Sequence, residues 1–207
     1  MWYERWSVRL VILCVFVFIV QMASESFTDA FALVSANVLF APWTLVTSIF
    51  LHGSVDHLLY NMFALALFGM ILESIIGGKK FLMLFFSGGI FASIGAALFY
   101  PSAIGASGAI FAILGALTIL RPRMVVWVAG IPMPMFVAAA VWALMDLVGM
   151  FAPGQTANAA HLFGLAFGLV YGYTLVKKFR EERRQKSAGP LSRTDIDNWE
   201  RKWMVQP

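Results

Sequence analysis

Long apolar runs separated by short polar interruptions dominate the sequence. Six of them predict helices, at roughly residues 9–22, 57–76, 79–99, 104–120, 134–150 and 159–176. Several are shorter than the roughly 20 residues that a full membrane span needs. Short spans are tolerated where helix ends face a cavity or are buried among neighbouring helices. The pattern therefore predicts an all-α membrane protein whose core is a bundle of six transmembrane helices.

Two of the connecting segments stand out. Residues 23–56 form a long connection that is rich in Phe, Leu and Trp. A connection that is this apolar is expected to be partly helical, and to lie in the membrane interface or fold back on the bundle. Residues 124–134 contain Trp127, Gly130, Pro132 and Pro134, which favour an extended connection over a helix.

The composition supports the membrane assignment. Of the 207 residues, 60% are hydrophobic and only 13% are charged, and the mean hydropathy is +0.80. A soluble domain of this length would expose too much apolar surface, so the bilayer is the expected solvent. The first apolar run follows Arg5 and Arg9, as in a signal peptide, but no A-x-A cleavage pattern ends it. We therefore expect a retained first helix.

The basic residues indicate an orientation. With six spans, every Lys and Arg falls on the same side of the membrane as the two termini, whereas residues 23–56, 100–103 and 151–158 contain neither. The positive-inside rule then predicts a multi-pass protein of the cell membrane with both termini in the cytoplasm. The same asymmetry explains the formal net charge of +4, and no nucleic-acid-binding motif accompanies it.

Charge also divides the chain into two predicted parts. Residues 1–178 are expected to form the membrane domain, and residues 179–207 a charged cytoplasmic tail. Near the end of this tail, Ile196, Trp199 and Trp203 share a helical spacing. That spacing fits either a short helix on an anionic leaflet or a solvated tail.

Several polar side chains within the apolar runs fall at a similar depth. A rise of about 1.5 Å per residue places Ser107 about 21 Å, His161 about 24 Å and Asn61 about 27 Å above the cytoplasmic edge. Asp146, on the fifth predicted helix, reaches a similar level. Polar groups inside a membrane are unfavourable unless they face the protein interior and have partners. The layer therefore predicts a hydrated pocket that opens to the outside.

Glycine spacing predicts which helices are neighbours. Gly164, Gly168 and Gly172 recur every four residues on the last predicted helix. Small residues at this spacing allow two helix backbones to approach closely. The fourth and sixth helices must be neighbours if the Ser107 hydroxyl is to reach a ring nitrogen of His161 at about 3 Å.

Four motifs, in this order along the chain, resemble those of the rhomboid intramembrane serine proteases. They are WTLVT and FLH at 43–47 and 50–52, HLLYNM at 57–62 with Gly69 and Glu73, GASG at 105–108, and ANAAH at 157–161 with Gly164 and Gly168. The resemblance covers residues 43–173. A GxSG motif alone is a weak signal, whereas four motifs in order at this topology are specific.

The resemblance implies a serine endopeptidase that needs no cofactor or metal and cleaves single-span transmembrane proteins near the outer membrane face. Ser107 would attack the scissile carbonyl, and His161 would take the proton and later return it, with no third acid. His57 and Asn61 lie at i and i+4 on one helix face. They would stabilise the oxyanion together with the Ser107 backbone N–H. Phe111 replaces a tyrosine found in many members and would pack on His161.

Three further residues are interpreted against this background. Because the implied mechanism has no acid, Asp146 is assigned a gating or structural role, and orientation of His161 is the alternative. His52 is interpreted as a hydrogen-bonding residue of the first connection rather than a catalytic group. Thr44 stands where an arginine is common in the family, which removes one expected anchor of that connection.

Three other function classes compete with the serine protease. A zinc metalloprotease would recruit as ligands His52, Asp56, His57 and His161. The HExxH motif of such enzymes is absent. A rhomboid-like protein that binds transmembrane clients without cutting them is disfavoured by the presence of both Ser107 and His161. A transporter or channel would need charged residues along a continuous path, whereas the predicted polar layer is confined to the outer third.

Overall fold

The structure is a computed structural model of the chain, and it describes residues 5–152, 156–188 and 193–204. The chain divides into two compact units, Met1–Tyr173 and Thr174–Pro207. The first unit contains all of the residues to which the sequence assigns chemistry, so the whole candidate site belongs to that unit.

Helices are found at all six predicted ranges. They are α1 (Trp6–Ala23), α4 (Val55–Ile76), α5 (Gly78–Phe99), α6 (Ser107–Leu120), α7 (Met135–Gly149) and α8 (Asn158–Ala188). Among the described residues, α1, α4, α5 and α8 are long and apolar enough to cross a membrane, whereas α6 and α7 are shorter apolar helices. The protein is therefore a helical membrane protein, and the count of six spans stays a prediction.

The segment between α1 and α4 folds into short pieces of structure. These pieces are α2 (Glu25–Phe31), β1 (Leu33–Val34), η2 (Ser35–Asn37), α3 (Thr44–Thr47) and η3 (Ser48–Phe50). Strand β1 pairs in antiparallel fashion with β2 (Ser102–Ala103), just before α6. Leu33 is buried in a small cluster with Ala92 and Ala160. These contacts fasten the segment to the chain that leads into the GASG motif.

Residues 124–134 adopt the predicted extended conformation. Strands β3 (Val125–Val128) and β4 (Ile131–Pro134) form an antiparallel hairpin. Its two-residue turn consists of Ala129 and Gly130, both with positive φ, as expected of a tight hairpin turn. Two small strand pairs thus accompany the helices.

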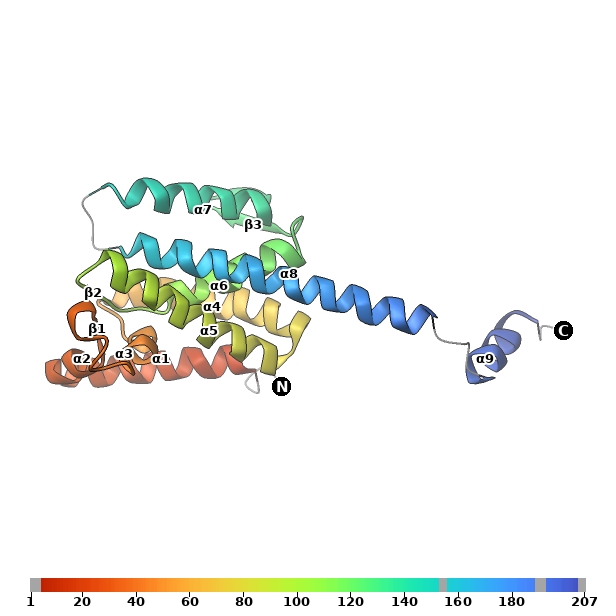
Figure 1. Cartoon of the computed structure of the whole chain (residues 1–207), viewed down its shortest axis with the longest axis horizontal. Coiled ribbons are helices and arrows are strands. Elements are labelled where there is room, and N and C mark those ends of the chain that lie inside the picture. The colour runs from red at the N-terminus through yellow and green to blue at the C-terminus, as the bar shows by residue number, and fades with distance from the viewer. Residues whose placement is uncertain (1–4, 153–155, 189–192, 205–207) are drawn as a thin grey trace. The chain divides into compact units, whose positions relative to one another are not determined.

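Helix α6 forms the centre of the first unit. It contacts α4, α5 and α7, and nine of its 14 residues are buried. Figure 1 shows α7 and α1 at opposite edges of this unit, with α4, α5 and α6 between them. Because Ser107 is the first residue of α6, the most enclosed helix of the unit carries the candidate nucleophile.

A carboxylate on α4 caps the start of α1. Arg5 provides no side-chain cap for α1. Glu73 instead accepts hydrogen bonds from the backbone N–H groups of Trp6 (2.9 Å) and Ser7 (3.0 Å), and from the Ser7 hydroxyl (2.8 Å). A negative charge is favourable at a helix N-terminus. The contact between Glu73 and Ser7 joins residues that are 66 positions apart in the sequence.

The second unit contains the end of α8 and α9 (Arg193–Trp203). The side chains of Ile196 and Trp199 are exposed on α9. The side chain of Trp203 lies outside the described residues. Helix α9 agrees with the helical spacing seen in the sequence, and its place on a membrane surface stays a prediction.

Candidate active site

The backbone before α6 presents Ser107 at a helix N-terminus. Gly105 has φ of +129°, a conformation that favours glycine, and its N–H donates to the Ser48 carbonyl at 2.9 Å. Ala106 precedes the helix and provides no side-chain cap. The N–H groups of the first turn of an α-helix, here starting with Ser107, have no partner within the helix. They therefore favour an anion at this point.

The contact between α6 and α8 is made by glycines. A methyl group on Gly164 would collide with the carbonyl oxygen of Gly108, and one on Gly168 would collide with that of Ala112. Both obstacles are backbone atoms, which cannot rotate away. The predicted close approach of these two helices is confirmed, and it requires glycine on the α8 side.

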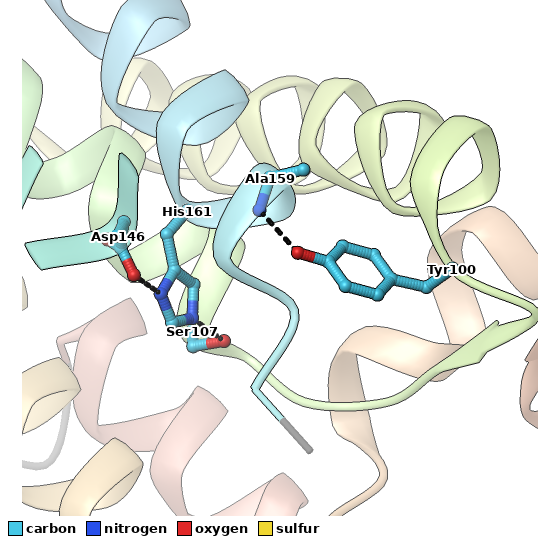
Figure 2. A network of polar contacts seen from close by, with 5 residues as sticks. All are labelled: Tyr100, Ser107, Asp146, Ala159 and His161. Atoms are coloured by element: carbon cyan, nitrogen blue, oxygen red, sulfur yellow. Dashed lines mark hydrogen bonds and ion pairs between the residues drawn. The ribbon is translucent and has the colours of Figure 1, made fainter. Parts of the chain in front are cut away.

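Three side chains form a continuous hydrogen-bonded chain across α6, α8 and α7 (Figure 2). The Ser107 Oγ lies 2.8 Å from Nε2 of His161. The opposite ring nitrogen, Nδ1, lies 2.9 Å from Oδ1 of Asp146. The pairing of Ser107 with His161 agrees with the sequence prediction. With Asp146, a hydroxyl, an imidazole and a carboxylate are linked by two consecutive hydrogen bonds.

Aromatic side chains restrain His161 and the start of α8. The ring of Phe111 stacks on the His161 ring, with centroids 4.3 Å apart and an interplanar angle of 4°. The stack lies where the sequence predicted an aromatic ring against His161. The Ala159 N–H, in the first turn of α8, donates to the Tyr100 hydroxyl at 3.1 Å (Figure 2). This bond satisfies one of the unpaired donors at the helix end.

His57 and Asn61 lie on α4, across from Ser107. The Asn61 amide donates to the His57 carbonyl at 2.8 Å, so one of its two N–H groups is used within the helix. The Gly53 N–H approaches Nδ1 of His57 at 3.4 Å. A methyl group on Gly105 would lie 2.8 Å from Nε2 of His57. The Nε2 side of this ring therefore faces the backbone just before Ser107.

His52 lies beside His57 but does not line the cavity. It is 2% exposed, its Nδ1 lies 3.3 Å from the Phe50 carbonyl, and its ring centroid lies 5.2 Å from that of His57. Burial, followed by the neighbouring His57 ring, lowers the pKa of His52 to about 4. The residue is therefore neutral at physiological pH, which fits a packing role better than an acid–base role.

A cavity of about 990 Å³ joins these residues. Its lining includes His57, Asn61, Ser107, Phe111, Trp142 and His161. A volume of this size falls within the range of ligand pockets. The described part of the chain holds no group of three or more His, Cys, Asp or Glu side chains that is arranged to bind a metal ion. The four ligands of the zinc alternative are thus not brought together.

Some residues of the site were not singled out from the sequence. Gly53 and Trp142 line the cavity, and Tyr100 both lines it and holds the first turn of α8. Nothing in the local sequence marks these three positions. Gly105 is different, because it belongs to the GASG motif that the sequence already singled out.

Comparison with known proteins identifies one family model and several relatives that resemble the chain. Residues 40–178 match the Rhomboid domain. The mitochondrial Rhomboid protein 1 of Saccharomyces cerevisiae is 28% identical over 174 residues, which cover 77% of this chain and 49% of the relative. The Bacillus subtilis rhomboid protease GluP is 47% identical over 77 residues, 36% of this chain and 15% of the relative. The human presenilin-associated rhomboid-like protein, mitochondrial, is 32% identical over 163 residues, which cover 71% of this chain and 42% of the relative. The chain spans about half or less of these relatives.

Proposed function

The chain belongs to the rhomboid family, and on that premise we propose that it is an intramembrane serine endopeptidase with Ser107 as nucleophile and His161 as base. The observation that carries the proposal is the 2.8 Å separation between Ser107 Oγ and His161 Nε2. A nucleophile within hydrogen-bond reach of a base is the geometric requirement for covalent catalysis. The family assignment supports the same chemistry, since one relative carries the name rhomboid protease.

In the proposed reaction, Ser107 attacks the carbonyl carbon of a peptide bond. The Oγ–C bond forms, the Ser107 proton moves to Nε2 of His161, and the carbonyl oxygen becomes negatively charged. Collapse of this intermediate breaks the C–N bond, and Nε2 gives its proton to the leaving amine. A water molecule from the cavity then repeats the sequence on the acyl-enzyme, which releases the second product and restores Ser107.

Three donors are proposed to stabilise the oxyanion. The Ser107 N–H belongs to the uncapped first turn of α6. The Nε2 side of His57 faces the same stretch of backbone, and the Asn61 amide carries a second N–H besides the one donated to His57. A preorganised donor of this kind typically contributes about 3 kcal/mol to transition-state stabilisation.

The proposed substrates are single-span transmembrane proteins, cut near the outer membrane face. The cavity lies near the N-terminal ends of α6 and α8, because Ser107 and His161 occupy the first turns of those helices. The charge asymmetry supports an outward orientation of these ends. The bilayer is the medium of the reaction, with six spans and both termini in the cytoplasm. No cofactor takes part in the steps proposed.

The proposal is tested by incubating the purified full chain in liposomes with a model single-span substrate. The parent is expected to yield a product band, and Ser107→Ala is expected to yield none. Equal cutting by Ser107→Ala would overturn the proposal. If EDTA abolished cutting while the serine variant retained it, the zinc alternative would replace it. Binding of the substrate without cutting by the parent would indicate a non-proteolytic rhomboid.

A further inference from the structure

The carboxylate of Asp146 contacts His161, and the proposed mechanism with Ser107 and His161 alone does not include this contact. Its Oδ1 lies 2.9 Å from Nδ1 of His161, on the ring nitrogen opposite the one that faces Ser107 (Figure 2). Both partners are shielded, with side-chain exposures of 9% for Asp146 and 12% for His161. A carboxylate and an imidazole at this distance, away from bulk water, form a strong and directional contact.

Asp146 is buried in the second half of α7, where its neighbours along the helix are not. Within residues 140–149, all of which the structure describes, Asp146 is the one buried residue. Its neighbours Met145 and Leu147 are 64% and 50% exposed. Its second oxygen, Oδ2, has no hydrogen-bond partner among the described residues. A buried carboxylate in an apolar helix is unfavourable unless it is paired, and His161 is the partner that the structure provides.

The stacking of Phe111 does not fix the His161 ring by itself. A face-to-face stack at 4.3 Å and 4° restrains the plane of the ring. Rotation of the ring by 180° preserves that plane but exchanges nitrogen and carbon positions, so the stack does not oppose it. The bond to Asp146 distinguishes the two orientations, because it is made only when Nδ1 points towards α7. The same bond requires the proton on Nδ1, which leaves the lone pair of Nε2 facing Ser107.

We propose that Asp146 is a positioning residue that completes a Ser107–His161–Asp146 triad. The inference rests on the proposed protease function. When Nε2 takes the serine proton, the Nδ1 proton stays in place, and His161 becomes positively charged beside the carboxylate. The carboxylate stabilises this state without accepting the proton, as in soluble serine proteases. The other titratable side chains that line the cavity with His161 are His57 and Tyr60 on α4 and Tyr100 at the end of α5.

The first experiment measures the His161 tautomer in the full chain in detergent micelles. The chain has three histidines, so ¹⁵N-histidine labelling gives a simple spectrum, and His161→Gln identifies the signals of His161. The parent is expected to carry the proton on Nδ1. Asp146→Leu is expected to shift the proton towards Nε2. Met145→Leu, which places the same side chain on the exposed neighbour, is expected to match the parent.

The second experiment measures kcat and KM for the model substrate. Asp146→Leu and Asp146→Asn are expected to lower kcat by about 10- to 100-fold with little change in KM, a smaller loss than the roughly 10⁴-fold seen in soluble triads. The loss is expected in kcat rather than in KM, because the base is misoriented while the cavity that binds the substrate is unchanged. A purely structural role would lower the unfolding temperature and leave kcat per folded molecule close to that of the parent.

Each result decides between the alternatives. An unchanged His161 tautomer in Asp146→Leu, or a kcat equal to that of the parent in a folded Asp146→Asn, would overturn the triad while leaving the Ser107–His161 protease intact. Absence of cutting by the parent would overturn the proposed function, and the tautomer measurement would still decide whether Asp146 orients the ring. Asp146→Asn keeps the side-chain volume and serves if Asp146→Leu fails to fold.

Discussion

Two helices that flank the candidate active-site cavity are held in place in opposite ways. Helix α6 has nine of 14 residues buried, whereas α7 has four of 15. On the α6 side, backbone lies directly against backbone, at Gly164 against Gly108 and at Gly168 against Ala112. On the α7 side, the outer part of the helix is attached through one buried polar residue, Asp146.

The two kinds of contact constrain different features of the site. The α6–α8 contact consists of close-packed backbone, which deforms little and therefore fixes the distance between Ser107 and His161. The α7 contact depends on a hydrogen bond between Asp146 and His161, which is directional and is broken when either partner moves. In the proposed protease, one side of the cavity sets the distance between Ser107 and His161, and the other sets the orientation of the His161 ring.

The largest effect is expected when the backbone contact is forced apart. In Gly164→Ala, the new methyl group meets the Gly108 carbonyl oxygen, and the two helices must separate. A displacement of about 1 Å between reacting groups lowers the rate roughly 100-fold, and overpacking destabilises by about 1–3 kcal/mol. Initial rates on the model substrate and thermal unfolding measure both effects.

The matched control for this substitution adds one carbon elsewhere on the same helix. Val170 is 66% exposed, so Val170→Ile is expected to retain the parent rate and stability. If Gly164→Ala cut the substrate within about threefold of the parent rate, close packing would not be what fixes the distance from Ser107 to His161.

Acidic pH tests the stability of the closely packed α6 side through His52. This residue follows η3, and η3 contacts α6. The pKa of His52 in the folded chain, about 4, lies below its ordinary value of 6.5. Between these values the unfolded chain binds more protons, so stability is lost as pH falls from about 6.5 towards 4. The loss is expected to reach up to about 3 kcal/mol.

His52→Asn isolates this effect, because its amide replaces the Nδ1 donor without titrating near neutral pH. Thermal unfolding of the parent and His52→Asn at pH 7, 5.5 and 4.5 makes the comparison. The variant is expected to lose less stability than the parent on acidification. Equal losses would show that His52 is not the group that responds to acid.

The smallest effect is expected on the α7 side. The rings of Trp142 on α7 and Phe68 on α4 meet edge to face, with centroids 6.3 Å apart. Such pairs contribute about 1 kcal/mol, so Trp142→Ala is expected to lower the unfolding temperature less than Gly164→Ala does. Trp142→Phe keeps an aromatic ring at this position, so its unfolding temperature is expected to lie closer to that of the parent. A larger loss for Trp142→Ala than for Gly164→Ala would reverse the assigned roles of the two sides.

The sequence predicted the positions of the helices and the common level of Ser107, His161 and Asp146, since both depend on quantities that run along the chain. Apolar runs locate helices, and a constant rise places Ser107, His161 and Asp146 at a common level. The glycine spacing on α8 indicated a close helix contact, and the i+4 position of Phe111 placed its ring on the face of Ser107.

What the sequence did not predict depends on rotation about helix axes and on contacts between distant segments. Helix α7 is apolar on every side, so its pattern does not indicate which face Asp146 occupies. The cap that Glu73 provides for α1, and the bond from Ala159 to Tyr100, join residues far apart in the chain. No local pattern encodes such contacts, because each depends on how the helices pack.

The most direct test of the central claim is to react the full chain in micelles with a fluorophosphonate and map the adduct by mass spectrometry. The chain contains several serines, so the position of the adduct is itself informative. A nucleophile activated by His161 predicts one adduct, on Ser107, that forms in the parent and is lost in His161→Gln. An adduct on another serine, or equal labelling of Ser107 in parent and His161→Gln, would contradict the account.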